Sequence, residues 1–141
     1  MPPEQQALHD WNTKIIADFR ANAGRCGPPF ENAEMVILHT RGARTGKPRE
    51  NPLCALLDRG RLFVFASKAG APTNPDWYHN LKAHPDVEVE HGTDRFRARA
   101  VEVTGPEREA LYARQASLMP QFAEYAASTS RVIPVVELAG N

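Results

Sequence analysis

The sequence predicts an α+β domain that is mainly β, with about six mostly antiparallel strands and peripheral helices. The first observation is that segments of alternating polar and apolar residues are short and are separated by turn-compatible sequences. The second is that helical patterns stand between these segments without a regular β-α-β order, which argues against a Rossmann sheet. Six strands of this kind are enough to close into a small barrel.

The composition fits a single globular domain over residues 1–141. Hydrophobic residues make up 42% of the chain and charged residues 24%, an ordinary balance. Lys and Arg together number 17, as do Asp and Glu, so the global basic field of a nucleic-acid-binding protein is absent. No apolar run approaches the roughly 20 residues of a membrane span. No signal peptide is visible, and the expected compartment is the cytoplasm.

The first predicted element is an amphipathic helix over about residues 5–23. Its apolar residues recur at three- and four-residue steps, namely Leu8, Trp11, Ile15 and Phe19. The polar face carries charges of both signs, which favours packing on the body of the protein over a membrane surface. Gly24 ends the helix.

The barrel is expected over about residues 33–138. Its strands are predicted at about residues 35–39, 51–57, 61–66, 86–90, 95–103 and 132–138. The turn-compatible stretch Asp58–Gly60 joins the second and third strands into a hairpin, and His91–Thr93 joins the fourth and fifth. The sixth strand closes the barrel.

Three further helices are expected between the strands. Asn74 is predicted to cap the first of them, with Pro75 at its first helical position and Pro85 beyond its end. Thr104–Glu107 resembles a capping box at the start of the next helix, which runs to about Met119. A further short helix follows directly.

The most basic stretch of the chain is the loop from Thr40 to Arg49, between two predicted strands. It carries four cations and two glycines in ten residues. Forked arginine donors suit phosphate oxygens, and glycines let a loop expose its backbone N–H groups. The stretch therefore fits an anion cradle, although a solvated hairpin loop explains it equally well. It is not a Walker loop, because the Gly-Lys-Ser/Thr ending is missing.

A second candidate segment runs from Phe65 to Pro72, where a strand ends in Ser67 and Lys68 followed by small residues. Small residues permit close approach to a flat ring or a phosphate, and the N-terminus of the following helix favours anions. A flexible connection between a strand and a helix is the alternative interpretation.

Four aromatic residues have two interpretations each. Trp77 and Tyr78 either wall an aromatic ligand or anchor their helix on the barrel. Phe122 and Tyr125 share one helical face, where they either cap a pocket or belong to the core. The histidines lack metal-ligand spacing, the two cysteines form no CxxC motif, and no Ser-His-Asp set stands out. Neither a metal site nor hydrolytic chemistry is therefore expected.

Four segments, taken together, resemble the deazaflavin-dependent nitroreductase family, whose members use coenzyme F-420. They are residues 40–53, 66–72, 74–81 and 131–136. Their order and spacing make a strong match that runs from about Val36 to Leu138. The resemblance implies a split β-barrel, an FMN-binding-like fold, which agrees with the predicted strands. It also implies an oxidoreductase that transfers a hydride from the reduced coenzyme to a small organic acceptor.

The resemblance further implies which residues hold the coenzyme. They are Arg44, Thr45, Lys47, Arg49, Asn51, Pro52, Leu53, Ala66, Ser67, Lys68, Asp76, Trp77, Tyr78 and Asn80. The coenzyme's phosphate and oligoglutamate tail are anionic, which matches the basic loop. Catalytic roles are assigned to Ser67, as a hydrogen-bond partner of the acceptor or ring edge, and to Tyr125, as a donor.

The expected substrate pocket consists of Met119, Phe122 and Tyr125. The characterised nitroreductase branch has three tyrosines at these positions, and only one phenol is present here. A quinone, an activated alkene and a nitro compound are all compatible acceptors. Two alternatives stay open, namely an FMN-binding split-barrel oxidoreductase and a non-catalytic deazaflavin-binding protein. A homodimer also stays open, and no nucleic acid is expected as a partner.

Overall fold

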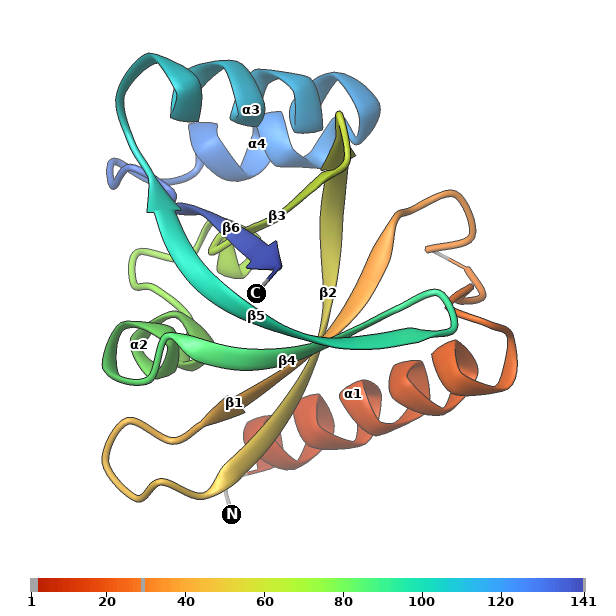
Figure 1. Ribbon diagram of the computed structural model, residues 1–141. Coiled ribbons are helices and arrows are strands. Elements are labelled where there is room, and N and C mark those ends of the chain that lie inside the picture. Colours follow the sequence, from red (N-terminus) through yellow and green to blue (C-terminus); the bar gives the residue numbers. More distant parts are fainter. Residues whose placement is uncertain (1–2, 29, 141) are drawn as a thin grey trace.

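Six strands form a closed barrel with helices packed around it (Figure 1). The computed structural model describes residues 3–28 and 30–140, and the predicted domain limits at residues 1 and 141 lie outside them. The strands are β1 Met35–Arg41, β2 Pro48–Asp58, β3 Arg61–Phe65, β4 Asp86–His91, β5 Asp94–Val103 and β6 Val135–Gly140. The helices are α1 Pro3–Ala21, α2 Asp76–Ala83, α3 Gly105–Leu118 and α4 Gln121–Ala127, with a 3-10 turn η1 at Lys68–Gly70.

Each strand of the barrel pairs with two neighbours, in the order β1-β2-β3-β6-β5-β4 and back to β1. All of these pairings are antiparallel. The closing contact places Ile37 of β1 opposite Glu90 of β4. The predicted fold class is therefore confirmed, as are the two hairpins β2–β3 and β4–β5.

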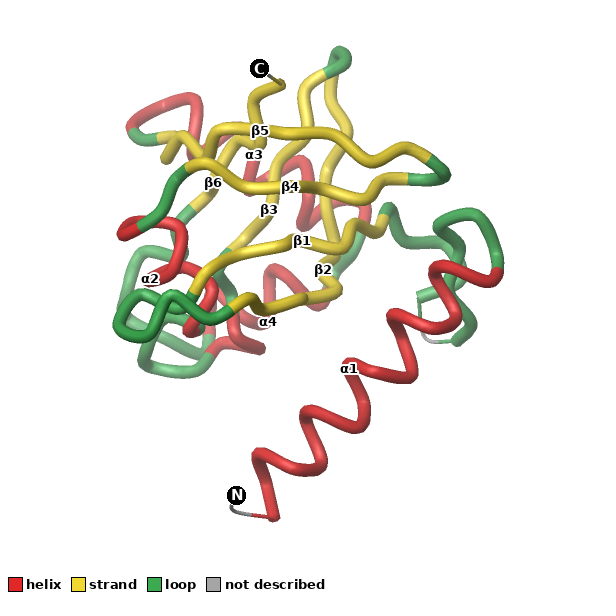
Figure 2. The backbone as a smooth tube through the Cα atoms, turned by 60° about the horizontal axis from the view of Figure 1, so that its bottom comes forward, coloured by secondary structure: helices red, strands yellow, loops and turns green. Residues whose placement is uncertain are grey.

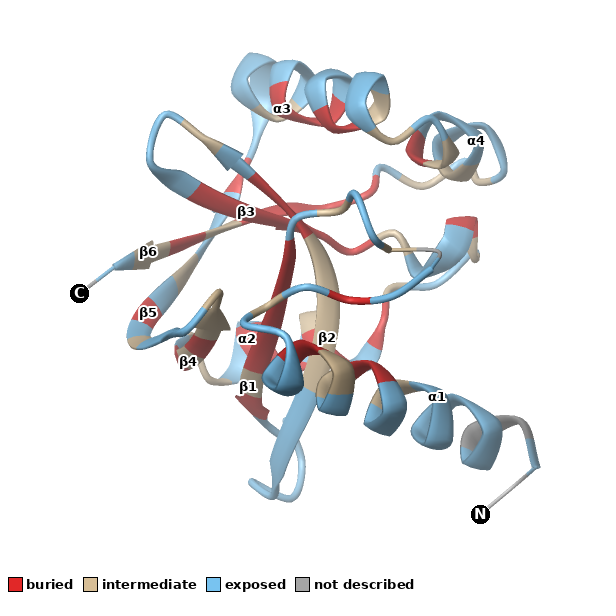
Figure 3. Ribbon diagram, turned by 90° about the vertical axis from the view of Figure 1, so that its right-hand side faces the viewer, coloured by how far each residue is buried: buried red, intermediate tan, exposed pale blue. Residues whose placement is uncertain are grey.

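Every second residue of a strand points into the barrel. In β1, Val36 and Leu38 belong to the cluster inside the barrel, while Ile37 belongs to a separate cluster beneath α1. Burial of apolar surface contributes about 25 cal/mol per Å², so this alternation decides which face of each strand turns inward. A third cluster lies between the barrel and helices α3 and α4, whose inner sides are buried (Figure 3).

Helix α1 packs on the barrel along its C-terminal half. Ile15 and Phe19 are buried there, as the amphipathic pattern predicts. Towards the N-terminus the helix diverges from the barrel (Figure 2), and Leu8 and Trp11 are 60% and 46% exposed. The ring of Trp11 meets that of Phe30 edge-on, with centroids 6.4 Å apart. Among the described residues, none of the helices has both the length and the apolar character needed to cross a membrane.

The predicted cap of α2 is wrong. The helix begins at Asp76, and Pro75 rather than Asn74 occupies the N-cap position, without a side-chain capping bond. The reason is that the side-chain oxygen of Asn74 accepts a hydrogen bond from Nη1 of Arg131 (2.7 Å). A tertiary contact thus takes the oxygen that a capping interaction needs.

The predicted capping box of α3 is also wrong. Thr104 stands at the N-cap position, but its side chain makes no capping hydrogen bond. Glu107 turns away from the backbone and accepts a hydrogen bond from Arg61 of β3 (3.2 Å). The charged partner on the barrel replaces the reciprocal bonds of a capping box.

The sixth strand starts later than predicted, at Val135 instead of Val132. Val132 is 71% exposed, and the carbonyl of Pro134 accepts a hydrogen bond from the backbone of Ala66 (3.0 Å). A proline has no N–H to donate to a strand ladder, which favours a start after Pro134. The segment before β6 therefore lies against the loop that follows β3.

Candidate functional site

The loop between β1 and β2 is a compact turn held by α2. The N–H of Gly42 donates to the carbonyl of Lys47 (2.9 Å), and that of Gly46 to the carbonyl of Gly42 (2.8 Å). Gly46 has a φ of 69°, a region that glycine enters without a Cβ clash. The N–H of Ala43 donates to the side-chain oxygen of Asn80 on α2 (2.9 Å). The basic loop is thus fixed against the end of the barrel.

A recess of about 370 Å³ lies between this loop and α2. This basic recess is lined by Gly42, Ala43, Arg44, Thr45, Arg49, Asp76, His79 and Asn80. Arg44 and Arg49 are exposed, and neither pairs with a carboxylate in the described part of the chain. Two guanidinium groups with unused donors at one recess are suited to binding a phosphate.

A second recess, of about 210 Å³, lies farther along β2 beside the end of β3. This apolar recess is lined by Phe30, Pro52, Leu53, Cys54, Phe65, Ser67, Lys68, Ala69, Trp77, Gln121, Phe122 and Tyr125. Aromatic and aliphatic groups dominate it, with a few polar groups among them, which is the usual make-up of a small-molecule site. Residues of β2 and α2 line both recesses, which therefore lie along the same two elements.

The strand-end loop, residues 66–74, carries Ser67 and Lys68 into the apolar recess. Its backbone is left-handed at three successive residues, Lys68 (φ 46°), Ala69 (φ 52°) and Gly70 (φ 80°). For a residue with a Cβ this conformation costs roughly 1–2 kcal/mol. A Cβ added at Gly70 would lie 3.0 Å from the carbonyl oxygen of Tyr125. The loop therefore packs directly on the backbone of α4.

Two titratable groups in the apolar recess are neutral at pH 7. Burial raises the pKa of the Tyr125 phenol, so this group stays protonated and able to donate. Burial, with a smaller contribution from Cys26, raises the pKa of the Cys54 thiol to about 11. Since the thiolate is the nucleophilic form, Cys54 is inert at neutral pH.

Most of the predicted site residues line one of the two recesses. At the basic recess are Arg44, Thr45, Arg49, Asp76 and Asn80. At the apolar recess are Pro52, Leu53, Ser67, Lys68, Trp77, Phe122 and Tyr125. The structure thus brings together the two predicted catalytic residues, on the strand-end loop and on α4.

Five predicted residues lie elsewhere. The hydroxyl of Tyr78 donates to Glu102 (2.6 Å), and burial together with this bond raises the pKa of Tyr78 to about 12. Tyr78 lines a different recess, with Lys82 and Glu102. The sulfur of Met119 accepts a hydrogen bond from Gln115 (3.5 Å). The remaining three, which line neither the basic nor the apolar recess, are Lys47, Asn51 and Ala66.

Several lining residues were absent from the sequence prediction. Cys54 follows Pro52 by two positions in β2, and residues two apart in a strand lie on the same face. This spacing was sufficient to predict Cys54 beside Pro52. Phe30 comes from the connection between α1 and β1, which has no periodic pattern. His79 carries no signal that separates it from a surface histidine.

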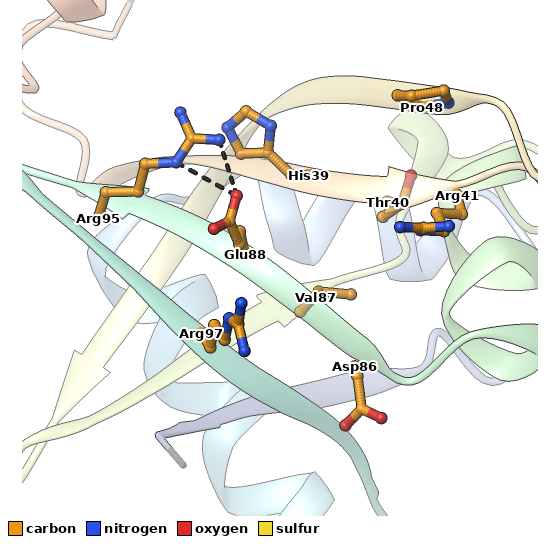
Figure 4. A pocket seen from close by; sticks show the side chains of 9 residues that line it. All are labelled: His39, Thr40, Arg41, Pro48, Asp86, Val87, Glu88, Arg95 and Arg97. Carbon is orange, nitrogen blue, oxygen red and sulfur yellow. Dashed lines mark hydrogen bonds and ion pairs between the residues drawn. The ribbon is translucent and has the colours of Figure 1, made fainter.

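Further unpaired cations extend from the basic loop onto the outer face of the barrel. A hollow of about 720 Å³ lies across β1, β4, β5 and the start of β2. It is lined by His39, Thr40, Arg41, Pro48, Asp86, Val87, Glu88, Arg95 and Arg97 (Figure 4). Arg95 bonds to Glu88 (2.7 Å). Arg41 and Arg97 have no such partner among the described residues, so positive charge collects at this end of a chain whose net charge is zero.

A histidine and two glutamates on the same face bring possible ligand atoms within 4.8 Å of one another: His39, Glu50 and Glu90. Arg20 of α1 reaches between the carboxylates, with Nη2 at 2.6 Å from Glu50 and 2.8 Å from Glu90. Its hydrogen bond is the main reason why the pKa of Glu90 falls to about 2. The guanidinium of Arg20 thus occupies the position between the two carboxylates that a metal ion would need. The cluster of Arg20, His39, Glu50 and Glu90, called the α1 clamp below, joins α1 to the barrel.

The residues of the two recesses fit coenzyme F-420. An anionic phosphate requires cationic donors, which Arg44 and Arg49 supply at the basic recess. A flat deazaflavin ring requires apolar walls and a backbone that allows close approach, as at Ala69 in the strand-end loop. Both requirements are met at recesses that have β2 and α2 as common elements of their lining.

Known proteins with similar sequences act with this coenzyme. The chain matches the family described as F420H(2)-dependent quinone reductase over residues 11–139. An F420H(2)-dependent quinone reductase of Mycobacterium tuberculosis strain H37Rv is 39% identical over 137 residues, which cover 93% of this chain and 87% of that protein.

Two solved structures share the fold at comparable identity. One, described as an F420-H2 dependent reductase (FDR-A), is 38% identical with a TM-score of 0.68, covering 74% of this chain and 93% of that one. Another, described as a domain-swapped dimer, is 32% identical with a TM-score of 0.70, covering 97% of this chain and 99% of that one. The resemblance drawn from the four segments is thus confirmed, and the chain belongs to the F420H(2)-dependent quinone reductase family.

Proposed function

We propose that this chain reduces a quinone with the hydride of reduced coenzyme F-420, bound across the basic and apolar recesses. Family membership makes the chain an F-420-dependent oxidoreductase. The observation that carries the rest is that two recesses of complementary chemistry lie along β2 and α2. One offers unpaired arginines to an anion, and the other offers apolar walls to a ring.

The basic recess binds the phosphate in this proposal. Arg44 and Arg49 donate to its oxygens, and the bond from Ala43 to Asn80 keeps the loop in place. Asn80 thus acts mainly by positioning the loop. Hydrogen bonds to a charged partner are stronger than neutral ones, so the arginines dominate the affinity at this end.

The apolar recess brings the acceptor to the ring. The bound coenzyme supplies the hydride, and the acceptor must also receive a proton to become a hydroquinone. Tyr125 is protonated at neutral pH and donates to the developing oxyanion of the acceptor. Ser67, at the edge of the recess, hydrogen-bonds the acceptor or the ring. Phe122 and Trp77 exclude water from the reacting atoms.

A quinone suits this recess better than a nitro compound does. Reduction of a quinone to a hydroquinone takes one hydride, whereas a nitro group needs successive reductions with loss of water. The single phenol of Tyr125 is enough to donate the proton that a quinone needs. Phe122, at another of the pocket positions predicted from the sequence, has no hydroxyl to donate a second one. The apolar walls match an acceptor without charge.

The assembly and location of the protein belong to the same proposal. The domain-swapped neighbour, which matches 97% of the chain, supports a homodimer. Light scattering of the purified protein at several concentrations measures this directly, and a monomer at all concentrations would contradict it. The cytoplasmic location stays a prediction.

The test of the proposed function is a fluorescence titration with oxidised coenzyme F-420, with FMN in parallel. We expect saturable binding of the deazaflavin and much weaker binding of FMN. Reduced coenzyme is then mixed with menadione, a nitroaromatic or an enone, and its oxidation is followed by absorbance. We expect the quinone, menadione, to give the fastest turnover of the three acceptors.

Each alternative has its own outcome. Binding of FMN in preference to the deazaflavin would move the chain to the flavin-binding branch of the fold. Tight deazaflavin binding without oxidation by any acceptor would make it a non-catalytic binding protein. Faster turnover of the nitroaromatic would contradict the choice of a quinone.

A further inference from the structure

The guanidinium of Arg131 lies behind the strand-end loop and holds it at both ends. Nε donates to the carbonyl of Ala71 (2.8 Å), Nη1 to that of Ala66 (3.1 Å) and Nη2 to that of Ser67 (2.8 Å). Nη1 also donates to the side-chain oxygen of Asn74 (2.7 Å). A single rigid fork therefore bonds the start, the middle and the end of the loop, while Arg131 lines neither recess.

The loop that Arg131 holds is in a conformation that needs support. Lys68 and Ala69 are non-glycine residues with positive φ, and Gly70 continues the same turn. Within the loop, Gly70 donates to Ser67 (2.9 Å) and Ala71 to Lys68 (3.0 Å). Left-handed residues in a row persist only where their surroundings determine them. The fork of Arg131 is the surrounding group that engages the carbonyl oxygens on both sides of the turn.

The loop that the fork holds also links the apolar recess to the segment before β6. Arg131 comes from the segment between α4 and β6, the loop follows β3, and Gly70 packs on the backbone of Tyr125 in α4. Ser67 and Tyr125 lie on different elements, so their separation depends on how the loop is seated. A shift of the loop would displace Ser67 and Lys68 relative to the phenol.

We propose that Arg131 is a positioning residue, which holds the strand-end loop in the left-handed conformation that presents Ser67 and Lys68 to the coenzyme. The inference rests on the proposed function for the identity of the ligand. Its structural part, the seating of the loop, applies to the protein without any ligand. A preorganised loop binds without the entropic cost of ordering, so loss of the fork weakens binding although Arg131 lines neither recess.

The test compares Arg131→Lys with a matched control, Arg108→Lys. Lysine keeps the charge of Arg131 but lacks the fork. Arg108 also anchors a backbone carbonyl, with Nε and Nη2 donating to Ile133 (3.1 and 2.8 Å), but it does not contact the strand-end loop. Both variants lose arginine–carbonyl bonds beside the same segment, so their thermal unfolding midpoints should fall by similar amounts.

Two measurements separate positioning from general stability. Hydrogen exchange of the ligand-free proteins should show the amides of residues 68–71, 73 and 74 exchanging at least tenfold faster in R131K, and at the wild-type rate in R108K. The dissociation constant of oxidised coenzyme F-420 should rise at least tenfold in R131K and less than twofold in R108K. Equal exchange of the loop in all three proteins, or equal affinities of the two variants, would overturn the inference.

Failure of the proposed function is distinguishable from failure of this inference. If the wild-type protein does not bind the coenzyme, the proposed ligand is wrong, and the exchange measurement still decides whether Arg131 seats the loop. If R131K does not fold, Asn74→Ala removes one acceptor of the same fork. This variant should speed exchange of the amides of residues 68–71 and 73 severalfold, and wild-type exchange rates in it would contradict the role of the fork.

Discussion

Side chains of the same type take different roles here because their partners differ. The hydroxyl of Tyr78 is bonded to Glu102. Tyr125 lines the apolar recess, and its hydroxyl has no hydrogen-bond partner among the described residues. Likewise Arg20 is neutralised by two carboxylates, while Arg49 has no carboxylate partner in the described part of the chain. A donor without an internal partner is available to a ligand. The structure thus selects which tyrosine and which arginine serve the site.

We expect Tyr125→Phe to lower turnover of a quinone by about 100-fold, because general acid catalysis contributes roughly that much or more. The dissociation constant of the coenzyme should stay within twofold. Because the pKa of Tyr125 is raised above its ordinary value of 10, the phenol donates throughout neutral pH and turnover should fall only above pH 10. Steady-state kinetics from pH 6 to pH 10.5 check both points, and unchanged turnover in the variant would exclude the donor role.

We expect Arg49→Ala to weaken binding of oxidised coenzyme F-420 by about tenfold, since a hydrogen bond to a charged group contributes roughly 1.5–3 kcal/mol. Arg25→Ala is the control, because Arg25 is also an exposed cation but lies in the connection between α1 and β1. Fluorescence titration of both variants measures the effect. Equal losses of affinity would show that general charge matters rather than the basic recess.

The helices and strands differ in how firmly local sequence determines them. The alternation of the strands and the turns between them predicted both hairpins correctly. The caps of α2 and α3 were wrong because Asn74 and Glu107 bond to arginines far away in the chain. The start of β6 was misplaced for a local reason, because Pro134 has no N–H to donate to a strand ladder. Local patterns therefore predict an element well where no distant charged group competes for its ends.

Attachment of α1 should depend on pH through Glu90. The folded-state pKa of about 2 lies below the ordinary 4.5, so the carboxylate stabilises the fold above pH 4.5, and this contribution is lost as the pH falls through 2. We expect Glu90→Gln to lower the free energy of unfolding at pH 7 by roughly 1–3 kcal/mol.

Urea denaturation at pH 7 and pH 3 checks this prediction. The difference between wild type and E90Q should shrink by about half or more at pH 3, where the unfolded-state carboxyl is mostly protonated. Glu109→Gln serves as the control, because Glu109 is exposed and pairs only with the adjacent Arg108 among the described residues. A difference for E90Q that is the same at both pH values would contradict the α1 clamp.

For the molecule as a whole, the sequence predicted the barrel and most of the site, but not how the site is assembled. Arg44 and Ser67 could be found from motifs, because glycines and cations gather around them. The role of Arg131 could not be found, since its four acceptors are mainly backbone oxygens of another segment. The side chain of Tyr78 points away from the two recesses of the site because its hydroxyl bonds to Glu102. Glu102 lies in β5, and no spacing rule identifies it as the partner of Tyr78.

The distribution of charge over the molecule leads to a salt prediction. The net charge is zero, so distant charges largely cancel, and the coenzyme responds to the local group of unpaired cations. Because the Debye length is about 10 Å at 0.1 M salt, we expect affinity for the coenzyme to fall about fivefold between 50 and 500 mM NaCl. Isothermal titration measures this, and the double variant Arg44→Ala/Arg49→Ala should lose most of the dependence.

The closed barrel has a consequence for how the chain folds. β6 comes last in chain order among the strands of the barrel, yet it lies between β3 and β5, where Phe63 pairs with Glu137 and Val103 with Val135. The barrel cannot close on the ribosome until β6 has emerged, so the edges of β3 and β5 that pair with β6 stay unpaired until then. Because such long-range pairings slow folding, we expect refolding in milliseconds to seconds rather than microseconds. Chaperone capture of the nascent chain should therefore end only once β6 is available.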